Sequence, residues 1–227
     1  MKKLLLIMIV LLVSGAINAQ GSKGKLTNKS FLAFHVGPSF PMGDFGSTNF
    51  DNQNAGFAKT GYSLNLTYGY KLVQNFGLTA SLFYNNNGPD NAAIEKGVSG
   101  SIETDVFGKM NHWQWVGLTA GPMITQNLGS NVEMDLRIMG GVADANFPKV
   151  FHEDTIIVNQ DWSFAAIFHT GLDLRIGIGN GMFIFTNLDY QYMKPKFNLV
   201  FPDESPTIRS EQKMSVLNLT GGLGIRF

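Results

Sequence analysis

The 227-residue chain has no formal net charge and only 15% charged residues, well below the roughly 25% of an average soluble protein. It lacks the basic surface of a nucleic-acid-binding protein, so we expect no nucleic-acid partner. It has no cysteine, so we expect neither disulfides nor a lipid-modified cysteine.

Residues 1–30 are predicted to be a targeting sequence followed by a short tail. Lys2 and Lys3 precede the apolar run 4–13, and small residues lead from there to Ala19. This order is typical of a secretory signal peptide, and the run is shorter than the ~20 residues of a membrane-spanning helix. We expect a signal peptide over 1–19, a periplasmic tail over 20–30 and one domain over 31–227.

Eight segments of that domain alternate between apolar residues and polar or small ones, as a β-strand with two different faces does. In the second segment, for example, Tyr62, Leu64 and Leu66 alternate with Ser63 and Asn65. The predicted strands are 31–40, 61–70, 76–85, 112–124, a fifth that begins at Val132, 161–176, 182–193 and 215–227.

The connections between these strands alternate between long and short. The last short one contains Asn180-Gly181, the strongest short hairpin signal. This layout predicts an all-β protein, an eight-stranded antiparallel up-and-down transmembrane β-barrel with short periplasmic turns and long external loops.

The fourth strand is the irregular one, because Trp113 and Trp115 fall in the phase opposite to Val116 and Leu118. Either a bulge or a filled lumen would explain this.

Charge distribution separates a membrane barrel from a soluble one. A Lys or Arg on the lipid-facing side at mid-bilayer costs about 2–4 kcal/mol. Between the aromatic ends of the predicted strands, the apolar faces carry no charged residue. Aromatic residues gather near the strand ends, where amphipathic rings favour the membrane interface. They are Phe40, Tyr62, Tyr84, Trp162, Tyr190 and Tyr192 at the loop end and Tyr70, Phe76 and Phe227 at the turn end.

The opposite, inward faces carry the candidate site residues. An eight-stranded barrel is just wide enough for side chains to fill, so we favour an interlocked polar plug over an ion or solute path. The histidines lack the spacing of metal ligands, and we expect no metal, cofactor or catalytic residue. The predicted lumen network consists of Glu133, Asp135, Arg137, Asp173, Arg175, Asp189, Arg226, His35 and His169.

The last strand alternates Leu223, Ile225 and Phe227 with polar or small residues and stops on an aromatic one. It resembles the closing strand of bacterial outer-membrane barrels, in which a terminal aromatic residue is part of the signal for insertion. The resemblance implies recognition of these three residues by the barrel-assembly machinery.

Together with 18–20 (Asn-Ala-Gln) and 34–40 (Phe-His-Val-Gly-Pro-Ser-Phe), the segment 223–227 gives the chain a wider resemblance. The chain resembles the small outer-membrane barrels of the OmpX/OmpA type, and more narrowly the Bacteroidota outer membrane protein beta-barrel domain family, often labelled PorT-like or porin-like. The resemblance implies a Gram-negative outer-membrane location and contact with outer-membrane lipid or lipopolysaccharide. It supplies no catalytic residue.

Several functions remain open at this level. The long loops predict binding of an unknown extracellular or envelope partner, or support of secretion machinery, and a purely structural barrel is an equal alternative. A lipid-modifying enzyme would need His and Ser near lipid, but His169 falls on the inward phase and no Ser follows it. A soluble lipocalin-like lipid carrier would need an apolar lumen, and the inward charges argue against it.

Overall fold

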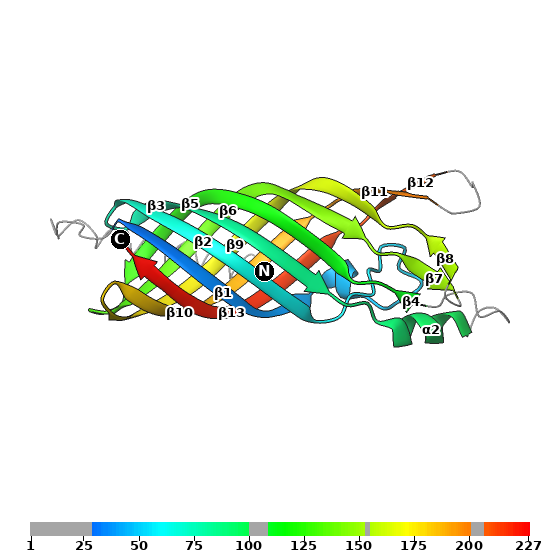
Figure 1. The fold of residues 1–227 in the computed structure, drawn as a ribbon, viewed down its shortest axis with the longest axis horizontal. Helices are drawn as coiled ribbons and strands as arrows, with labels where there is room; N and C mark the ends of the chain where they lie inside the picture. Colours follow the sequence, from blue (N-terminus) through cyan, green and yellow to red (C-terminus); the bar gives the residue numbers. More distant parts are fainter. Residues whose placement is uncertain (1–28, 100–108, 153–154, 201–206) are drawn as a thin grey trace, which may run out of the picture.

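The computed structural model describes residues 29–99, 109–152, 155–200 and 207–227. The predicted signal peptide and most of the tail lie outside these ranges, whereas Ser30, which we placed in the tail, is the first residue of a strand. Eight antiparallel strands close into a barrel, as predicted (Figure 1). They are β1 (Ser30–Pro41), β2 (Gly61–Val73), β3 (Phe76–Asn87), β5 (Trp113–Asn127), β6 (Val132–Phe147), β9 (Asp161–Gly179), β10 (Met182–Met193) and β13 (Met214–Arg226).

The strands form a simple meander. The order around the barrel is β1-β13-β10-β9-β6-β5-β3-β2, so each barrel strand pairs with the barrel strands before and after it in the chain. The first and last strands close the ring, with Phe34 opposite Leu223. No strand of the ring therefore keeps a free edge along its whole length, which removes the main aggregation hazard of a sheet.

Short turns join the strands at one end of the barrel. Asn180 and Gly181 connect β9 to β10 with φ angles of 51° and 76°. A two-residue hairpin turn of type I′ requires positive φ at both positions, which Asn and Gly adopt most readily. The predicted Asn-Gly hairpin is thus confirmed.

The other end carries secondary structure that we predicted only as connections. Figure 1 shows α2 and the short strands of this end extending beyond the barrel on the side away from the short turns. None of the helices within the described ranges is long and apolar enough to cross a membrane. The elements are η2 (Gly43–Gly46), α2 (Asn91–Ser99), the sheet of β4 (Lys109–Met110), β7 (Val150–His152) and β8 (Thr155–Val158), and the hairpin of β11 (Lys196–Leu199) and β12 (Ile208–Glu211).

Successive side chains alternate between an exposed outer surface and a buried lumen. On β1, Leu32 and Phe34 are exposed on the outside, whereas Ala33 and His35 are buried inside. The outward faces of the barrel strands are free of charged side chains except for Asp144, which lies at the loop end of β6 in register with Phe164. The barrel is thus apolar outside and holds its buried charged side chains inside, the reverse of a water-soluble domain.

Strand β5 keeps this alternation without interruption. Trp113 and Trp115 are buried in the lumen, whereas Val116 and Leu118 are exposed outside. The strand pairs with β3 in continuous register along 113–124. The two tryptophans therefore point inward because they fill the lumen, and the alternative explanation, a bulge in the strand, is wrong.

Candidate functional site in the barrel lumen

The turn end of the lumen contains aromatic rings stacked with guanidinium groups. Phe31 and Phe183 are buried there, with ring centroids 5.9 Å apart. The Arg175 guanidinium carbon lies 4.3 Å from the Phe31 centroid, and that of Arg226 lies 5.2 Å from the Phe183 centroid. These cation–π contacts orient both arginines toward the acids above them.

We call the next set of side chains the turn-end ion cluster: Lys71, Glu133, Asp135, Arg175 and Arg226. Glu133 accepts from Lys71 at 2.9 Å and lies 3.0 Å from Arg175 and 3.4 Å from Arg226. Arg175 also lies 2.6 Å from Asp135. Strands β2, β6, β9 and β13 are thus joined across the lumen by paired charges.

We call a second set the mid-barrel ion cluster: Arg137, Asp173, Asp189 and His169. Nη2 of Arg137 lies 2.9 Å from Asp173 and 3.1 Å from Asp189. His169 Nε2 lies 3.2 Å from the same Asp189 oxygen, and its Nδ1 lies 3.0 Å from the Thr119 hydroxyl. All four side chains are buried, so each charge depends on its partners rather than on water.

His35 belongs to neither ion cluster, although the Thr67 hydroxyl beside it also accepts from Arg137 Nη1 at 3.5 Å. Its Nδ1 lies 2.7 Å from the Thr220 hydroxyl and its Nε2 lies 3.1 Å from the Thr67 hydroxyl. Both ring nitrogens therefore have a hydroxyl partner, as expected for a buried structural histidine. Within the described ranges, no three His, Asp or Glu side chains are grouped so that they could hold a metal ion.

The two ion clusters balance one another in charge. The predicted set has four acids but only three arginines, and Lys71 supplies the fourth cation. We had assigned Lys71 to the turn after Tyr70, whereas β2 continues to Val73 with a register shift between Lys71 and Val73. Two signals could have found it: its odd number places it on the inward phase, and the predicted acids outnumbered the arginines.

Above the ions lies an amide layer, which consists of Asn65, Asn85, Gln191 and Asn218. Asn85 donates from Nδ2 to Oε1 of Gln191 at 3.0 Å. These two residues stand on β3 and β10, which are separated by three strands on either side of the ring, so the bond crosses the barrel. Five polar atoms of the layer are buried without a partner in the structure: Asn65 Oδ1, Asn85 Oδ1, Gln191 Nε2, Asn218 Oδ1 and Asn218 Nδ2.

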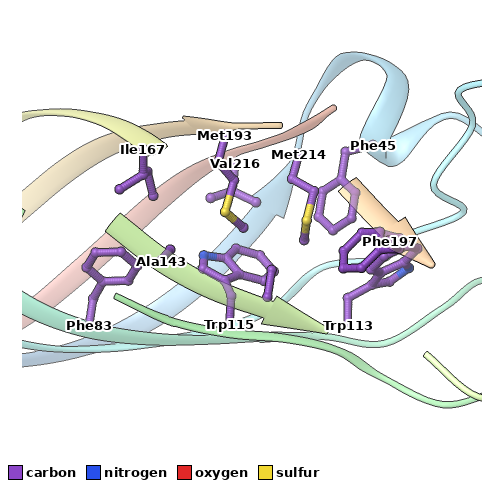
Figure 2. Packing of buried hydrophobic residues seen from close by; sticks show 12 residues of the cluster. Phe45, Phe83, Trp113, Trp115, Ala143, Ile167, Met193, Phe197, Met214 and Val216 are labelled. Atoms are coloured by element: carbon purple, nitrogen blue, oxygen red, sulfur yellow. The ribbon is translucent and has the colours of Figure 1, made fainter. Parts of the chain in front are cut away.

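The loop end of the lumen is apolar. We call the buried set that fills it the mouth cluster, and Figure 2 shows its side chains pointing toward one another from both walls. Gly117 makes room for it, because a Cβ there would lie 2.4 Å from Cζ of Phe83. The mouth cluster consists of Phe45, Ala58, Phe83, Trp113, Trp115, Ala143, Ala145, Ile167, Met193, Phe197, Met214 and Val216.

Phe45 enters the mouth cluster from the loop 42–60 rather than from the barrel wall. Its ring lies edge-on to Trp113 at 5.5 Å and to Trp115 at 5.8 Å between centroids. The neighbouring Asp44 accepts from Asn52 and pairs with Lys213 at 3.2 Å. The Asn52 hydrogen bond first, and then Lys213, hold the pKa of the Asp44 carboxyl below its usual value. This contact therefore stays charged at neutral pH.

No protein-family model matches the sequence, and no curated protein matches it either. Solved structures do share its fold. Neisserial surface protein A (NspA) aligns with a TM-score of 0.52 and 11% identity over 87% of this chain and 97% of that chain. OprG from Pseudomonas aeruginosa aligns with a TM-score of 0.52 and 10% identity over 88% of this chain and 96% of that chain. A major outer membrane protein from Thermus thermophilus aligns with a TM-score of 0.52 and 13% identity over 87% of this chain and 99% of that chain. The fold is that of a small outer-membrane β-barrel.

In this outer-membrane-type barrel, the three residues of the predicted insertion signal lie on the outer surface. Leu223, Ile225 and Phe227 are all exposed, and Ile225 stands in register with Leu32 and Met182. They therefore continue the apolar belt of the neighbouring strands.

Sequence reasoning placed all nine lumen residues on the inward side and missed the mouth cluster. The structure places eight of them in the two ion clusters, and the ninth, His35, lies between hydroxyl groups. The inward phase of Trp113 and Trp115 was the one signal of the mouth cluster in the sequence, and a filled lumen was one of the two explanations given for that phase. The argument that inward charges exclude an apolar lumen holds only for the turn-end half of this outer-membrane-type barrel.

Proposed function

We propose that the chain is an integral outer-membrane barrel whose lumen is closed by its own side chains. The observation that carries the proposal is the distribution of charge: the paired ions lie inside the lumen, at its turn end and its middle, while the outward faces carry no charged side chain apart from Asp144 at the loop end. Such a surface is suited to lipid, where an outward cation would be costly.

Closure follows from bonds that cross the barrel at successive heights. Lys71 reaches from β2 to Glu133 on β6 near the turn end, and Asn85 reaches from β3 to Gln191 on β10 higher up. The mouth cluster then fills the loop end with aromatic and thioether side chains. A hydrated ion has no continuous polar path through these layers.

Planar-bilayer recordings test the closed lumen. We expect the wild-type barrel to insert without conductance steps. Variants that thin one end alone, Phe45→Ala with Trp115→Ala at the mouth or Lys71→Ala with Arg226→Ala at the turn end, leave the amide layer and the mid-barrel ion cluster in place, so we expect them to stay closed. Steady ion conductance by the wild-type protein would contradict the proposal.

We place contacts with other molecules at the loop end. The sheet β4–β7–β8 and the hairpin β11–β12 extend beyond the barrel rim, where a rigid barrel would present them to an extracellular or envelope partner. We keep lipopolysaccharide as the proposed lipid contact and the PorT-like Bacteroidota barrels as the proposed family. We propose no catalytic step, because His169, on which a lipid-modifying activity would depend, is buried away from the lipid-facing surface.

A further inference from the structure

The loop-end half of the lumen combines an aromatic cage with buried amides that have unpartnered atoms. We propose that this half binds a small uncharged amphipathic molecule, an apolar ring or short chain with one hydrogen-bonding end, in place of the Phe45 ring. The proposal goes beyond the closed barrel, because a chamber sealed at its charged end can still accept a ligand from the loop side.

The cage is built by the barrel, but a loop fills it. Trp113 and Trp115 come from β5, and the Phe45 ring stands edge-on to both, with interplanar angles of 76° and 74°. Met193 and Met214 complete the surrounding wall, and their flexible thioethers adapt to different shapes. A cage that accepts the phenyl ring of a loop offers the same edge-on contacts to the ring of a ligand.

The loop is attached so that it can lift without opening the barrel. Its own backbone bonds, such as Ala58 N–H to Phe45 O at 3.1 Å, hold 44–58 together as a unit. Backbone bonds anchor its two ends: Met42 N–H donates to Ser215 O at 2.8 Å, Lys59 N–H donates to Gly88 O at 2.7 Å, and Phe57 O accepts from Asp90 N–H at 2.6 Å. Between these anchors, the loop is bonded to the barrel rim through the half-exposed Asp44–Lys213 pair, Gln212 donating to Asn54 O at 2.9 Å, and the Trp113 indole donating to Gly56 O at 3.0 Å. Exposed ion pairs of this kind contribute little.

The amide layer below the cage supplies the polar end of the site. Trp115 donates from Nε1 to Gln191 Oε1 at 3.4 Å, which links the cage to the amides. Gln191 Nε2 and both amide atoms of Asn218 are buried without partners in the structure, as are atoms of the ion clusters such as Arg175 Nε, and a buried polar group favours a hydrogen-bonding partner. Neutral amides offer both donors and acceptors, so they match a hydroxyl or an amide. A carboxylate is disfavoured, because Asp189 lies on the next inward position below Gln191.

Tryptophan emission can report this binding directly. The chain has three tryptophans, and Trp162 is the one on the outer surface. In a Trp162→Phe background, reconstituted in nanodiscs with a tryptophan-free scaffold protein, all emission comes from Trp113 and Trp115. We expect 3-phenyl-1-propanol to give a saturable change in tryptophan emission. Propylbenzene should bind more weakly than this alcohol because it leaves the amides unpaired, and 3-phenylpropanoate should bind more weakly because of its charge.

Two variants separate the loop from the amides. Phe45→Ala removes the internal competitor, so we expect the alcohol to bind about tenfold more tightly. Phe50→Ala is the matched control, because it removes an exposed phenyl ring from the same loop and should change nothing. Gln191→Leu should abolish the preference for the alcohol over the hydrocarbon while both still bind.

The proposal is overturned if the protein with Phe45 intact gives no saturable response to the alcohol. This holds even if the Phe45→Ala variant binds the alcohol, because that result would show only a cavity made by the substitution. It is also overturned if the alcohol and propylbenzene bind equally well, a comparison that needs no lumen variant and so does not depend on the folding of Gln191→Leu. Conductance of the wild-type barrel would refute the closed lumen but leave this binding test unchanged, so the two failures are distinguishable.

Discussion

Arg137 is the residue on which the mid-barrel ion cluster depends. It pairs with both Asp173 and Asp189, and its side chain is fully buried. Removing one partner of a buried ion pair costs about 3–5 kcal/mol, because the remaining charge is left uncompensated. We therefore expect Arg137→Met to lower the free energy of unfolding by about 3–5 kcal/mol, measured by urea titration in lipid vesicles.

A variant without the two uncompensated carboxylates provides the control for this prediction. Adding Asp173→Asn and Asp189→Asn to Arg137→Met removes both uncompensated charges, so the triple variant should be more stable than the single one. Equal stability of wild type and Arg137→Met would show that the ion cluster does not hold the lumen together.

The inward charges could be predicted residue by residue, because the period of a strand fixes which side each one faces. Their pairing could not, since it depends on which strands face each other across the barrel. Lys71 was missed for a local reason: it follows Tyr70 at the start of the five-residue connection 71–75 between two predicted strands, although β2 continues past it.

At the scale of the strands, the apolar belt gives a position-dependent prediction. Leu188 is at the middle of β10, in outward register with Leu172 and Leu219. A cation there faces the bilayer centre, so we expect Leu188→Arg to lower the free energy of unfolding in lipid by about 2–4 kcal/mol. Phe164→Arg, at a 78%-exposed position beyond the end of β10, should cost no more than about 1 kcal/mol.

Urea unfolding of both variants in the same vesicles gives the comparison. Equal losses at the two positions would mean that the outer surface does not cross a lipid layer, since only a bilayer makes the penalty depend on depth. A loss confined to Leu188→Arg supports the lipid-facing assignment.

The barrel strands were predictable as elements because each is long enough to show several alternations. The outer elements were not, because α2, β4, β7, β8, β11 and β12 span only two to nine residues. Such short elements are stable only through tertiary contacts, as β11 is through Asn198 N–H donating to Asp161 at 2.7 Å. The mouth cluster was missed for a related reason, since its Phe45 comes from a loop with no periodic pattern.

For the whole molecule, the distribution of side chains is the reverse of that in a water-soluble protein: the charged side chains lie in the lumen and apolar side chains cover the outer surface of the barrel. The closed ring of eight strands satisfies the backbone hydrogen bonds within the barrel, as a membrane-spanning sheet requires. The ion clusters then seal the turn end, and the mouth cluster with its loop-borne Phe45 fills the loop end.

The most direct test of this account is recovery of the protein in the outer-membrane fraction, followed by gel migration of boiled and unboiled samples. A closed barrel in lipid resists detergent until it is heated, so we predict outer-membrane recovery and a different mobility before and after boiling. A soluble protein with the same mobility in both samples would contradict the inside and outside assignments on which every other prediction depends.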